Sequence, residues 1–343
     1  MSKDRAGSAE FLGLRDIAAH AGVSHMTVSR VIRRPETVAE PTRQRVLAAI
    51  EALGYVPNLA ARDLVRGSSS FVCMVVSSLQ NVFFAATVEG LVRGLDPLGL
   101  QVMLGDAGFS AEREARLVRG FVARRPAGVV LMGTDHAPET VRLLSRSRAP
   151  VVETWDLTRA PIGACVGFDN VAVGRLAARH FRAIGARRAV VLGRSTPRNR
   201  KRIAGFLAEA KEVGLAHARH VELADGHALR VGREALAGLL DQAADDRPDA
   251  LFFVSDTLAI GALLEATRRG VAVPQEVAIL GFGDHPLGPE LTPSLSTITA
   301  PLEEMGHEAA RLIAGALAGE DIRGRVFDLG LSLIARESTA RAG

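Results

Sequence analysis

Cysteine is nearly absent from this chain of 343 residues, and aromatic residues are scarce. The two cysteines, Cys73 and Cys165, each stand inside an apolar run, and neither has the spacing of a metal or redox site. We therefore expect buried thiols in a reducing compartment, with no disulfide and no metal ion. Aromatic residues make up 4% of the chain against 48% for all hydrophobic residues, which is typical of an α/β protein with an aliphatic core.

Long apolar runs are missing too. No stretch is apolar over the roughly 20 residues that a membrane-spanning helix requires, and the N-terminal residues lack the charged-then-apolar pattern of a signal peptide. These absences predict a cytoplasmic protein with no membrane partner. Catalytic signatures are also missing, since there is no phosphate-binding loop and no Gly-x-Ser-x-Gly, and Gly281-x-Gly283 lacks a correctly placed third glycine before a helix. We expect neither enzyme activity nor a cofactor.

Positive charge is concentrated near the start of the chain. Residues 1–70 hold ten Lys/Arg and seven Asp/Glu, a net charge of +3, whereas the remaining residues carry a net +1. A local excess of this sign suits contact with nucleic acid, although an excess this small is only supporting evidence.

The chain divides into segments that differ in their sequence patterns. Residues 1–12 are polar and without pattern, which predicts a flexible tail. Residues 13–56 have the pattern of short helices with tight turns. Residues 57–70 join a helix-compatible stretch to the linker-like sequence Gly-Ser-Ser-Ser, and residues 71–343 form the large remaining part.

Beyond residue 70, short apolar runs alternate with amphipathic stretches such as residues 173–185 and 257–270. This alternation predicts strand–helix–strand units and parallel sheets with helices on both faces. About nine strands suit two doubly wound subdomains better than one sheet, and such folds bind ligands at the carboxyl ends of their strands. The strand candidates are residues 71–76, 100–104, 127–132, 150–154, 165–168, 188–193, 250–255 and 277–282.

Residues 14–32 have the pattern of two short helices joined by a turn. Gly22 permits the positive φ of a tight turn, and Ser24 can cap the second helix by accepting a backbone N–H. These features predict a helix-turn-helix whose second helix enters the major groove; a plain helical hairpin with a solvated polar face fits the short motif about equally well. The side chains expected to face inward are Ile17, Ala18, Ala21, Val23, Val28 and Val31. A third helix over residues 41–55 would cover the pair with Val46, Leu47, Ile50 and Leu53.

The run from Leu14 to Gly67 resembles the N-terminal module of the lac-repressor/galactose-repressor family of bacterial regulators. The matching motifs are AGVS–TVSRV, TR-RVL-AI–LGY-PN and A-R-L at 61–64, and the similarity extends to IARESTA at 334–340. Within the family, the chain is most similar to gluconate-operon repressors. The resemblance implies an all-α helix-turn-helix DNA-binding domain followed by an α/β periplasmic-binding-protein-like core of two doubly wound parallel-sheet subdomains.

The resemblance implies contacts with DNA at defined positions. His25 and Met26 match the variable base-reading positions, and Leu64 matches a wedge on a hinge helix that kinks the minor groove. Gly13 departs from the family, which usually has Thr or Ser there as a helix cap. The expected partner is near-palindromic double-stranded operator DNA bound by a homodimer. The implied DNA-binding residues are Ser24, His25, Met26, Thr27, Ser29, Arg30, Asn58, Ala61 and Leu64.

The resemblance also divides the core. It implies an N-subdomain of about residues 71–168 and 298–328, and a C-subdomain of about residues 169–297 and 329–340. A ligand would bind in the cleft between them and alter the affinity for the operator.

A sugar acid, with gluconate favoured, is the expected effector. Gly283 stands where many family members have an aspartate that binds neutral sugar hydroxyls. The absence of this carboxylate removes repulsion against an anionic ligand. Arg202 matches an arginine that points into the cleft, and a guanidinium suits a bidentate grip on a carboxylate. The alternatives are a transport-type sugar-binding module, or a regulator that responds to a neutral sugar or a nucleobase. The candidate effector-binding residues are Asn81, Phe83, Phe84, Glu153, Trp155, Phe168, Arg198, Arg202, Asp256 and Asp284. For Phe83 and Phe84 ordinary core packing, and for Asp256 helix capping, are the competing interpretations.

Overall fold

In the computed structural model the chain forms two compact units, residues 1–67 and residues 68–343. The structure describes residues 12–55, 69–79, 83–215 and 217–341. Four candidate site residues lie outside these ranges: Asn58, Ala61, Leu64 and Asn81.

The N-terminal unit contains three α-helices among its described residues, α1 (Leu14–Ala21), α2 (His25–Arg33) and α3 (Glu40–Leu53), with a short 3-10 helix between the last two. Gly22 ends α1 with φ 63°, as the turn between α1 and α2 requires. The buried hydrophobic side chains among the described residues of this unit are Ile17, Ala18, Ala21, Val28, Val31, Val46 and Ala49. The expected inward position of Leu47 was wrong: 45% of this residue is exposed, because Val46 and Ala49 supply the buried face of α3.

The N-terminal unit also accommodates its unusual first cap. Gly13 has no side-chain oxygen with which to cap α1. Instead the carboxylate of Asp16 reaches back and accepts the N–H of Gly13 at 2.7 Å, and its negative charge also suits the first turn of a helix.

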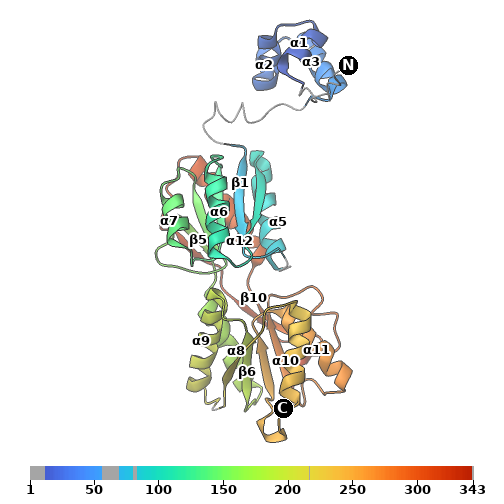
Figure 1. The fold of residues 1–343 in the computed structure, drawn as a ribbon, viewed down its shortest axis with the longest axis vertical. Coiled ribbons are helices and arrows are strands. Elements are labelled where there is room, and N and C mark those ends of the chain that lie inside the picture. Colours follow the sequence, from blue (N-terminus) through green and yellow to red (C-terminus); the bar gives the residue numbers. More distant parts are fainter. Residues whose placement is uncertain (1–11, 56–68, 80–82, 216, 342–343) are drawn as a thin grey trace, which may run out of the picture. The chain divides into compact units, whose positions relative to one another are not determined.

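The first subdomain of the core is a parallel sheet of six strands in the order β11-β5-β4-β3-β1-β2. Helices α5 (Phe83–Leu95) and α12 (Leu302–Leu317) cover one face, and α6 (Ala111–Val122) and α7 (Pro138–Ser145) the other (Figure 1). The bounds are β1 Phe71–Val76, β2 Gln101–Asp106, β3 Gly128–Met132, β4 Val151–Thr154, β5 Ala164–Gly167 and β11 Val326–Asp328. Both faces of the sheet are therefore buried, which explains why its central strands are almost continuously apolar.

The second subdomain repeats this plan in the order β12-β10-β9-β8-β6-β7, with β12 antiparallel to β10. Helices α8 (Asn170–Ala183) and α9 (Pro197–Glu212) pack together, as do α10 (Ala228–Leu240) and α11 (Asp256–Arg269). The bounds are β6 Ala189–Gly193, β7 Arg219–Glu222, β8 Ala250–Phe253, β9 Ala278–Phe282, β10 Ser296–Thr299 and β12 Ser332–Ile334. The doubly wound architecture predicted for the core is thus the one observed.

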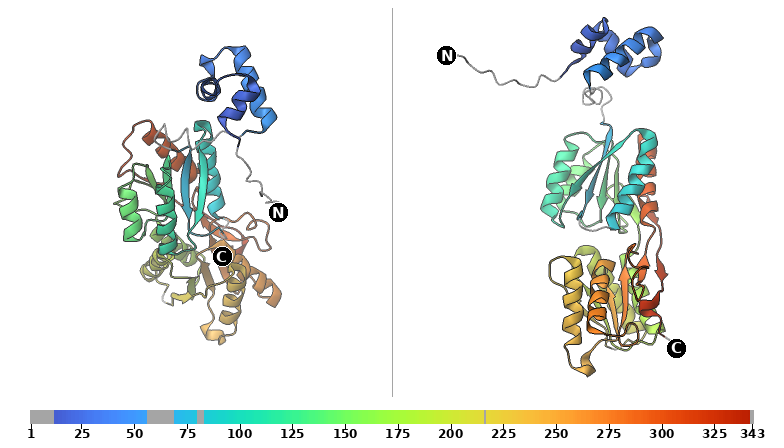
Figure 2. Two further views of the ribbon diagram at one scale, coloured as in Figure 1. Left: turned by 45° about the horizontal axis from the view of Figure 1, so that its top comes forward. Right: turned by 90° about the vertical axis from the view of Figure 1, so that its right-hand side faces the viewer.

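The chain crosses between the subdomains three times: after β5, after β10 and after β11. Figure 2 shows the result, with the red helix α12 packed in the first subdomain although β6 to β10 of the second subdomain precede it in the chain. Strand β10 pairs with β9 up to Ile298 and continues to Thr299. The second crossing therefore begins after Thr299, slightly beyond the expected boundary at 298.

Close helix contacts in the core depend on reciprocal pairs of glycines. A Cβ on any of these six glycines would lie 1.9–2.1 Å from a backbone oxygen of the partner helix, where no side chain fits. The pairs are Gly90 with Gly306 in α5 and α12, Gly174 with Gly205 in α8 and α9, and Gly232 with Gly261 in α10 and α11. Of the helices that the structure describes, none has the length and hydropathy needed to cross a membrane.

Candidate functional site

The outer face of α2 presents the side chains predicted to contact DNA. Ser24 precedes the helix, and its hydroxyl accepts the N–H of Thr27 at 3.2 Å, so the cap forms as predicted. Met26 is 62% exposed, and His25 and Arg30 are exposed beside it. An apolar, a polar and a cationic side chain thus share one solvent-facing helix surface, as base and phosphate contacts require.

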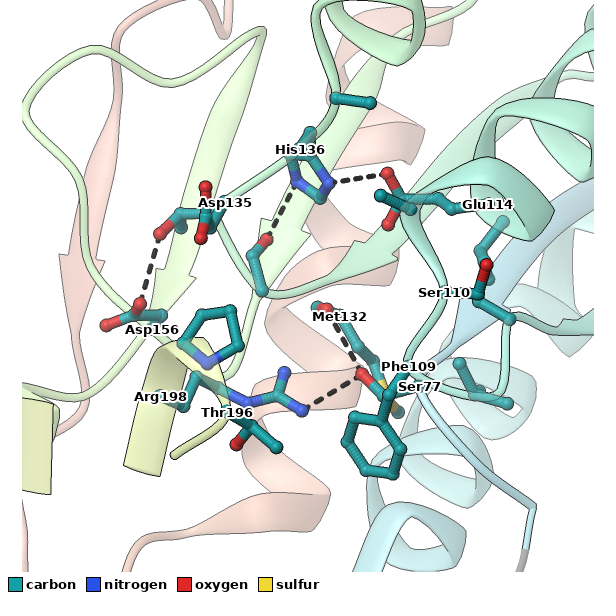
Figure 3. A pocket seen from close by; sticks show the side chains of 18 of the residues that line it. Ser77, Phe109, Ser110, Glu114, Met132, Asp135, His136, Asp156, Thr196 and Arg198 are labelled. Carbon is teal, nitrogen blue, oxygen red and sulfur yellow. Dashed lines mark hydrogen bonds and ion pairs between the residues drawn. The ribbon is translucent and has the colours of Figure 1, made fainter. Parts of the chain in front are cut away.

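The core contains a cavity of about 390 Å³ between its two subdomains. Its wall is built from the carboxyl ends of β1 to β4, from residues 107–114 around the start of α6, and from residues 194–198 at the start of α9 (Figure 3). This volume lies within the range of small-molecule sites. The polar side chains of the wall include Ser77, Glu114, His136, Asp156, Arg194 and Arg198.

Arg198 projects from the first turn of α9 into the cavity wall. Its guanidinium donates to the Ser77 hydroxyl at 2.9 Å and lies 5.6 Å from the ring centre of Phe84 and 5.9 Å from that of Trp155. Burial lowers the pKa of Arg198 to about 10, and the negative charge of Asp156 offsets only part of this effect. No carboxylate among the described residues forms an ion pair with Arg198, because Asp156 is paired with Lys201 at 2.5 Å.

The guanidinium of Arg202, one turn further along α9, is held by contacts with other residues of the core. Its Nε donates to Asn170 at 2.8 Å, a terminal nitrogen donates to the Val254 carbonyl at 2.9 Å, and its guanidinium lies 3.8 Å from the ring centre of Phe282. The residue is 5% exposed and is not part of the cavity wall. Arg202 therefore ties α9 to α8 and to the end of β8.

Aromatic side chains gather at the junction of the subdomains. Trp155 packs edge-on against Phe84 and Phe168, and Phe168 contacts Phe282. Trp155 has φ 69°, a strained conformation for a large side chain. Its indole N–H donates to Thr87 at 3.1 Å, and its carbonyl accepts from Asn170 at 2.9 Å. This cluster forms the floor on which Arg198 lies.

His136 lies beside the cavity between two acidic residues. Its Nδ1 is 3.0 Å from Glu114, and its Nε2 is 3.0 Å from the Gly133 carbonyl and 3.4 Å from Glu153. A carbonyl and an ionised carboxylate can only accept, so both ring nitrogens must carry a proton. Burial lowers the pKa of His136, but the bonds to Glu114 and Glu153 outweigh it and raise the pKa to about 9.

Two of the predicted effector-binding acids lie near the junction but outside the cavity wall. Asp256 is fully buried, and its carboxylate accepts the His285 N–H and the Thr297 hydroxyl, each at 2.8 Å. Burial raises the pKa of Asp256 to about 7. Asp284 pairs with Arg336 at 2.8 Å. Both acids connect loops of the second subdomain.

Of the ten residues predicted to bind the effector, nine are described and only Arg198 belongs to the cavity wall. Phe83 and Phe84 are buried in the core. Glu153 and Trp155 stand behind the wall and contact its side chains His136 and Arg198. Phe168 and Arg202 instead contact residues outside the wall. The polar wall residues that the sequence analysis missed include Ser77, Glu114 and His136. A usable signal existed, since Ser77 follows β1 and His136 follows β3 at the carboxyl edge of the sheet.

Two models of known protein families match the chain. The model of bacterial regulatory proteins of the lacI family matches residues 13–58, and that of a periplasmic binding protein-like domain matches residues 178–339. The HTH-type transcriptional regulator GntR of Pseudomonas aeruginosa is 37% identical over 329 residues, which are 95% of each chain. The chain belongs to the lacI family.

Other lacI-family proteins agree with this assignment. The regulator GntR of Escherichia coli K12 is 32% identical over 324 residues, covering 93% of this chain and 96% of that protein. A lacI-family transcriptional regulator from Silicibacter pomeroyi has a crystal structure with a TM-score of 0.89 and 32% identity, covering 96% and 100% of the two chains. This lacI-family chain is a DNA-binding transcriptional regulator and not an enzyme. The resemblance and the fold class predicted from the sequence are confirmed.

Proposed function

We propose that the protein is a repressor whose affinity for its operator changes when a sugar acid binds in the core cavity. The observation that carries this proposal is Arg198, a cation in the cavity wall that has a hydroxyl and two aromatic rings as neighbours but no ion-paired acid among the described residues. A cation in such surroundings is a binding site for an anion.

A carboxylate suits this place for geometric and electrostatic reasons. The guanidinium presents parallel N–H donors that match the two oxygens of a carboxylate, and one terminal nitrogen is already oriented by Ser77. Bringing an anion to Arg198 would offset the desolvation that lowers the pKa of this residue. The resemblance to gluconate-operon repressors makes gluconate, a six-carbon sugar acid, the favoured effector.

The DNA-binding half of the proposal rests on α2. A homodimer would place two copies of α2 in successive major grooves of a near-palindromic operator in the cytoplasm, with His25 and Met26 reading bases. Thr27, Ser29 and Arg30 would support phosphate and base contacts. Asn58, Ala61 and Leu64 remain predictions for a hinge helix, because they lie outside the described residues.

Coupling between the two halves requires that the ligand bind two states of the core unequally. The cavity wall combines residues of both subdomains, so a ligand that bridges Ser77 on one side and Arg198 on the other favours one closure angle. We propose that this closure alters the spacing of the two DNA-binding domains of a dimer.

The test is calorimetric titration of the full chain with gluconate and with sorbitol, its neutral counterpart. The proposal predicts binding of gluconate only, and a loss of about 10- to 100-fold in affinity for Arg198→Gln, since charge-assisted hydrogen bonds contribute about 1.5–3 kcal/mol. Arg230→Gln, which removes a 65% exposed arginine on α10, is the matched control and should bind as the wild type does. Equal binding of sorbitol, or undiminished binding by Arg198→Gln, would overturn the assignment.

A further inference from the structure

The cavity has a second polar pole besides Arg198. Glu114, in the first turn of α6, lines the wall with a side chain that is 14% exposed. Its Oε1 accepts from Nδ1 of His136 at 3.0 Å. No described residue donates to its other oxygen, Oε2, although an ionised carboxylate can accept about four hydrogen bonds. Glu114 therefore offers acceptor capacity to whatever occupies the cavity.

The orientation of Glu114 is fixed from behind by His136. The imidazole is 2% exposed and is held at Nε2 by the Gly133 carbonyl at 3.0 Å, with Glu153 at 3.4 Å. Glu153 is fixed in turn, because it accepts the N–H of Ile162 at 2.7 Å. Each member of this chain of contacts is immobilised by the next, so Glu114 is preorganised for a ligand.

The charges of Glu114, His136 and Glu153 do not cancel. Glu114 and Glu153 share one protonated imidazole, which leaves one net negative charge beside the cavity. Arg198 supplies the positive charge from α9, and Figure 3 shows Glu114 and Arg198 on different sides of the pocket. One pole of the cavity thus suits an anion, and the other suits hydrogen-bond donors and disfavours an anion.

We propose that Glu114 determines the specificity of the cavity for sugar monoacids. Its carboxylate accepts hydrogen bonds from the hydroxyl groups at the end of the ligand remote from the ligand's own carboxylate. It excludes ligands that carry a second carboxylate at that end. His136 is a positioning residue that fixes the carboxylate of Glu114 and does not contact the ligand. This inference rests on the proposed binding of a sugar acid through Arg198.

The matched ligands for a test are gluconate and glucarate. They have the same six-carbon chain and the same carboxylate at one end, but glucarate has a second carboxylate where gluconate has a hydroxyl. Unit charges of like sign a few ångströms apart near a protein surface repel strongly, so we expect the wild type to bind glucarate at least about 100-fold more weakly than gluconate.

Calorimetry on the full chain should compare three variants. Glu114→Gln should bind gluconate more weakly and should reduce its preference over glucarate to about 10-fold or less, because the repulsion is gone. Glu112→Gln, on the same turn of α6 but exposed, is the control and should keep the wild-type preference. His136→Gln should reduce the preference as well, since Glu114 then loses its fixed orientation.

The outcomes of these titrations distinguish failure of the inference from failure of the proposed function. If the wild type binds glucarate as well as gluconate, or if Glu114→Gln keeps the full preference, the inference is overturned while the sugar-acid function stands. A lower melting temperature of His136→Gln with an unchanged preference would refute the positioning role. If the wild type binds neither acid, the proposed function fails and the inference fails with it.

Discussion

Replacing Gly174 with alanine tests how the cavity is assembled. Gly174 lies where α8 crosses α9, and a Cβ there would be 1.9 Å from the Arg202 carbonyl oxygen and 2.4 Å from the Phe206 nitrogen. Both neighbours are backbone atoms, so no rotamer change can relieve the clash, and the helices must move apart by more than an ångström to restore ordinary contact at 3.4 Å. Overpacking usually costs about 1–3 kcal/mol, and we expect the upper end, about 3 kcal/mol, for Gly174→Ala.

This cost should appear in a thermal melt of the core. A loss of about 3 kcal/mol lowers the melting temperature of a domain this large by about 5–10 °C. Affinity for gluconate should fall as well, because the displaced α9 carries Arg198. Gly238→Ala is the matched control: Gly238 is an exposed residue inside α10, and a Cβ there meets nothing within 4 Å. It should stabilise the core by about 0.5–1 kcal/mol through helix propensity. If Gly174→Ala melts at or above the wild-type temperature, the close crossing of α8 and α9 is not as described.

Three further predictions follow from single side chains. Folding raises the pKa of His136 from 6.5 to about 9, so its contribution of about 3 kcal/mol to the free energy of unfolding is complete below pH 6.5 and is lost as the pH rises through 9. The difference in urea-unfolding free energy between the wild type and His136→Gln should therefore shrink between pH 6.5 and 9. A difference that stays constant over this interval would contradict the shift. Ser24→Ala removes the cap of α2 and should destabilise the N-terminal unit by about 0.5–2 kcal/mol in calorimetry, whereas an unchanged unfolding transition would show that the cap is dispensable. Substitutions of Met26 should change the preferred operator base in a binding selection while the affinity for gluconate stays constant; a changed effector affinity would contradict a role confined to DNA.

The strands buried on both faces could be predicted from the sequence, but the edge strands could not. All eight apolar runs singled out between residues 71 and 282 correspond to strands within about two residues at either end. Strand β7 and the three-residue strands β11 and β12 were not predicted, because each is short and is exposed along part of its length. Strand β10 escaped because its buried side chains include Ser296 and Thr297, whose hydroxyls are satisfied by distant residues.

The cavity was harder to predict because its wall comes from many separate segments. Arg198 could be found from a cluster of basic residues at the start of a helix. Arg202, four residues later, faces the protein instead, and this depends on Asn170 and Phe282, which no local pattern reveals. The interhelical glycines were equally hidden, since a glycine inside a helix ordinarily indicates only a loss of propensity.

The most direct test of the account is a titration of operator binding with gluconate, at one fixed salt concentration because phosphate contacts are sensitive to salt. The account predicts that gluconate changes the operator affinity of the wild type by about 5- to 150-fold. Arg198→Gln should bind the operator with wild-type affinity without ligand and should not respond at the gluconate concentration that saturates the wild type. A wild type that binds its operator equally well with and without any sugar acid, or an Arg198→Gln variant that responds as the wild type does, would contradict it.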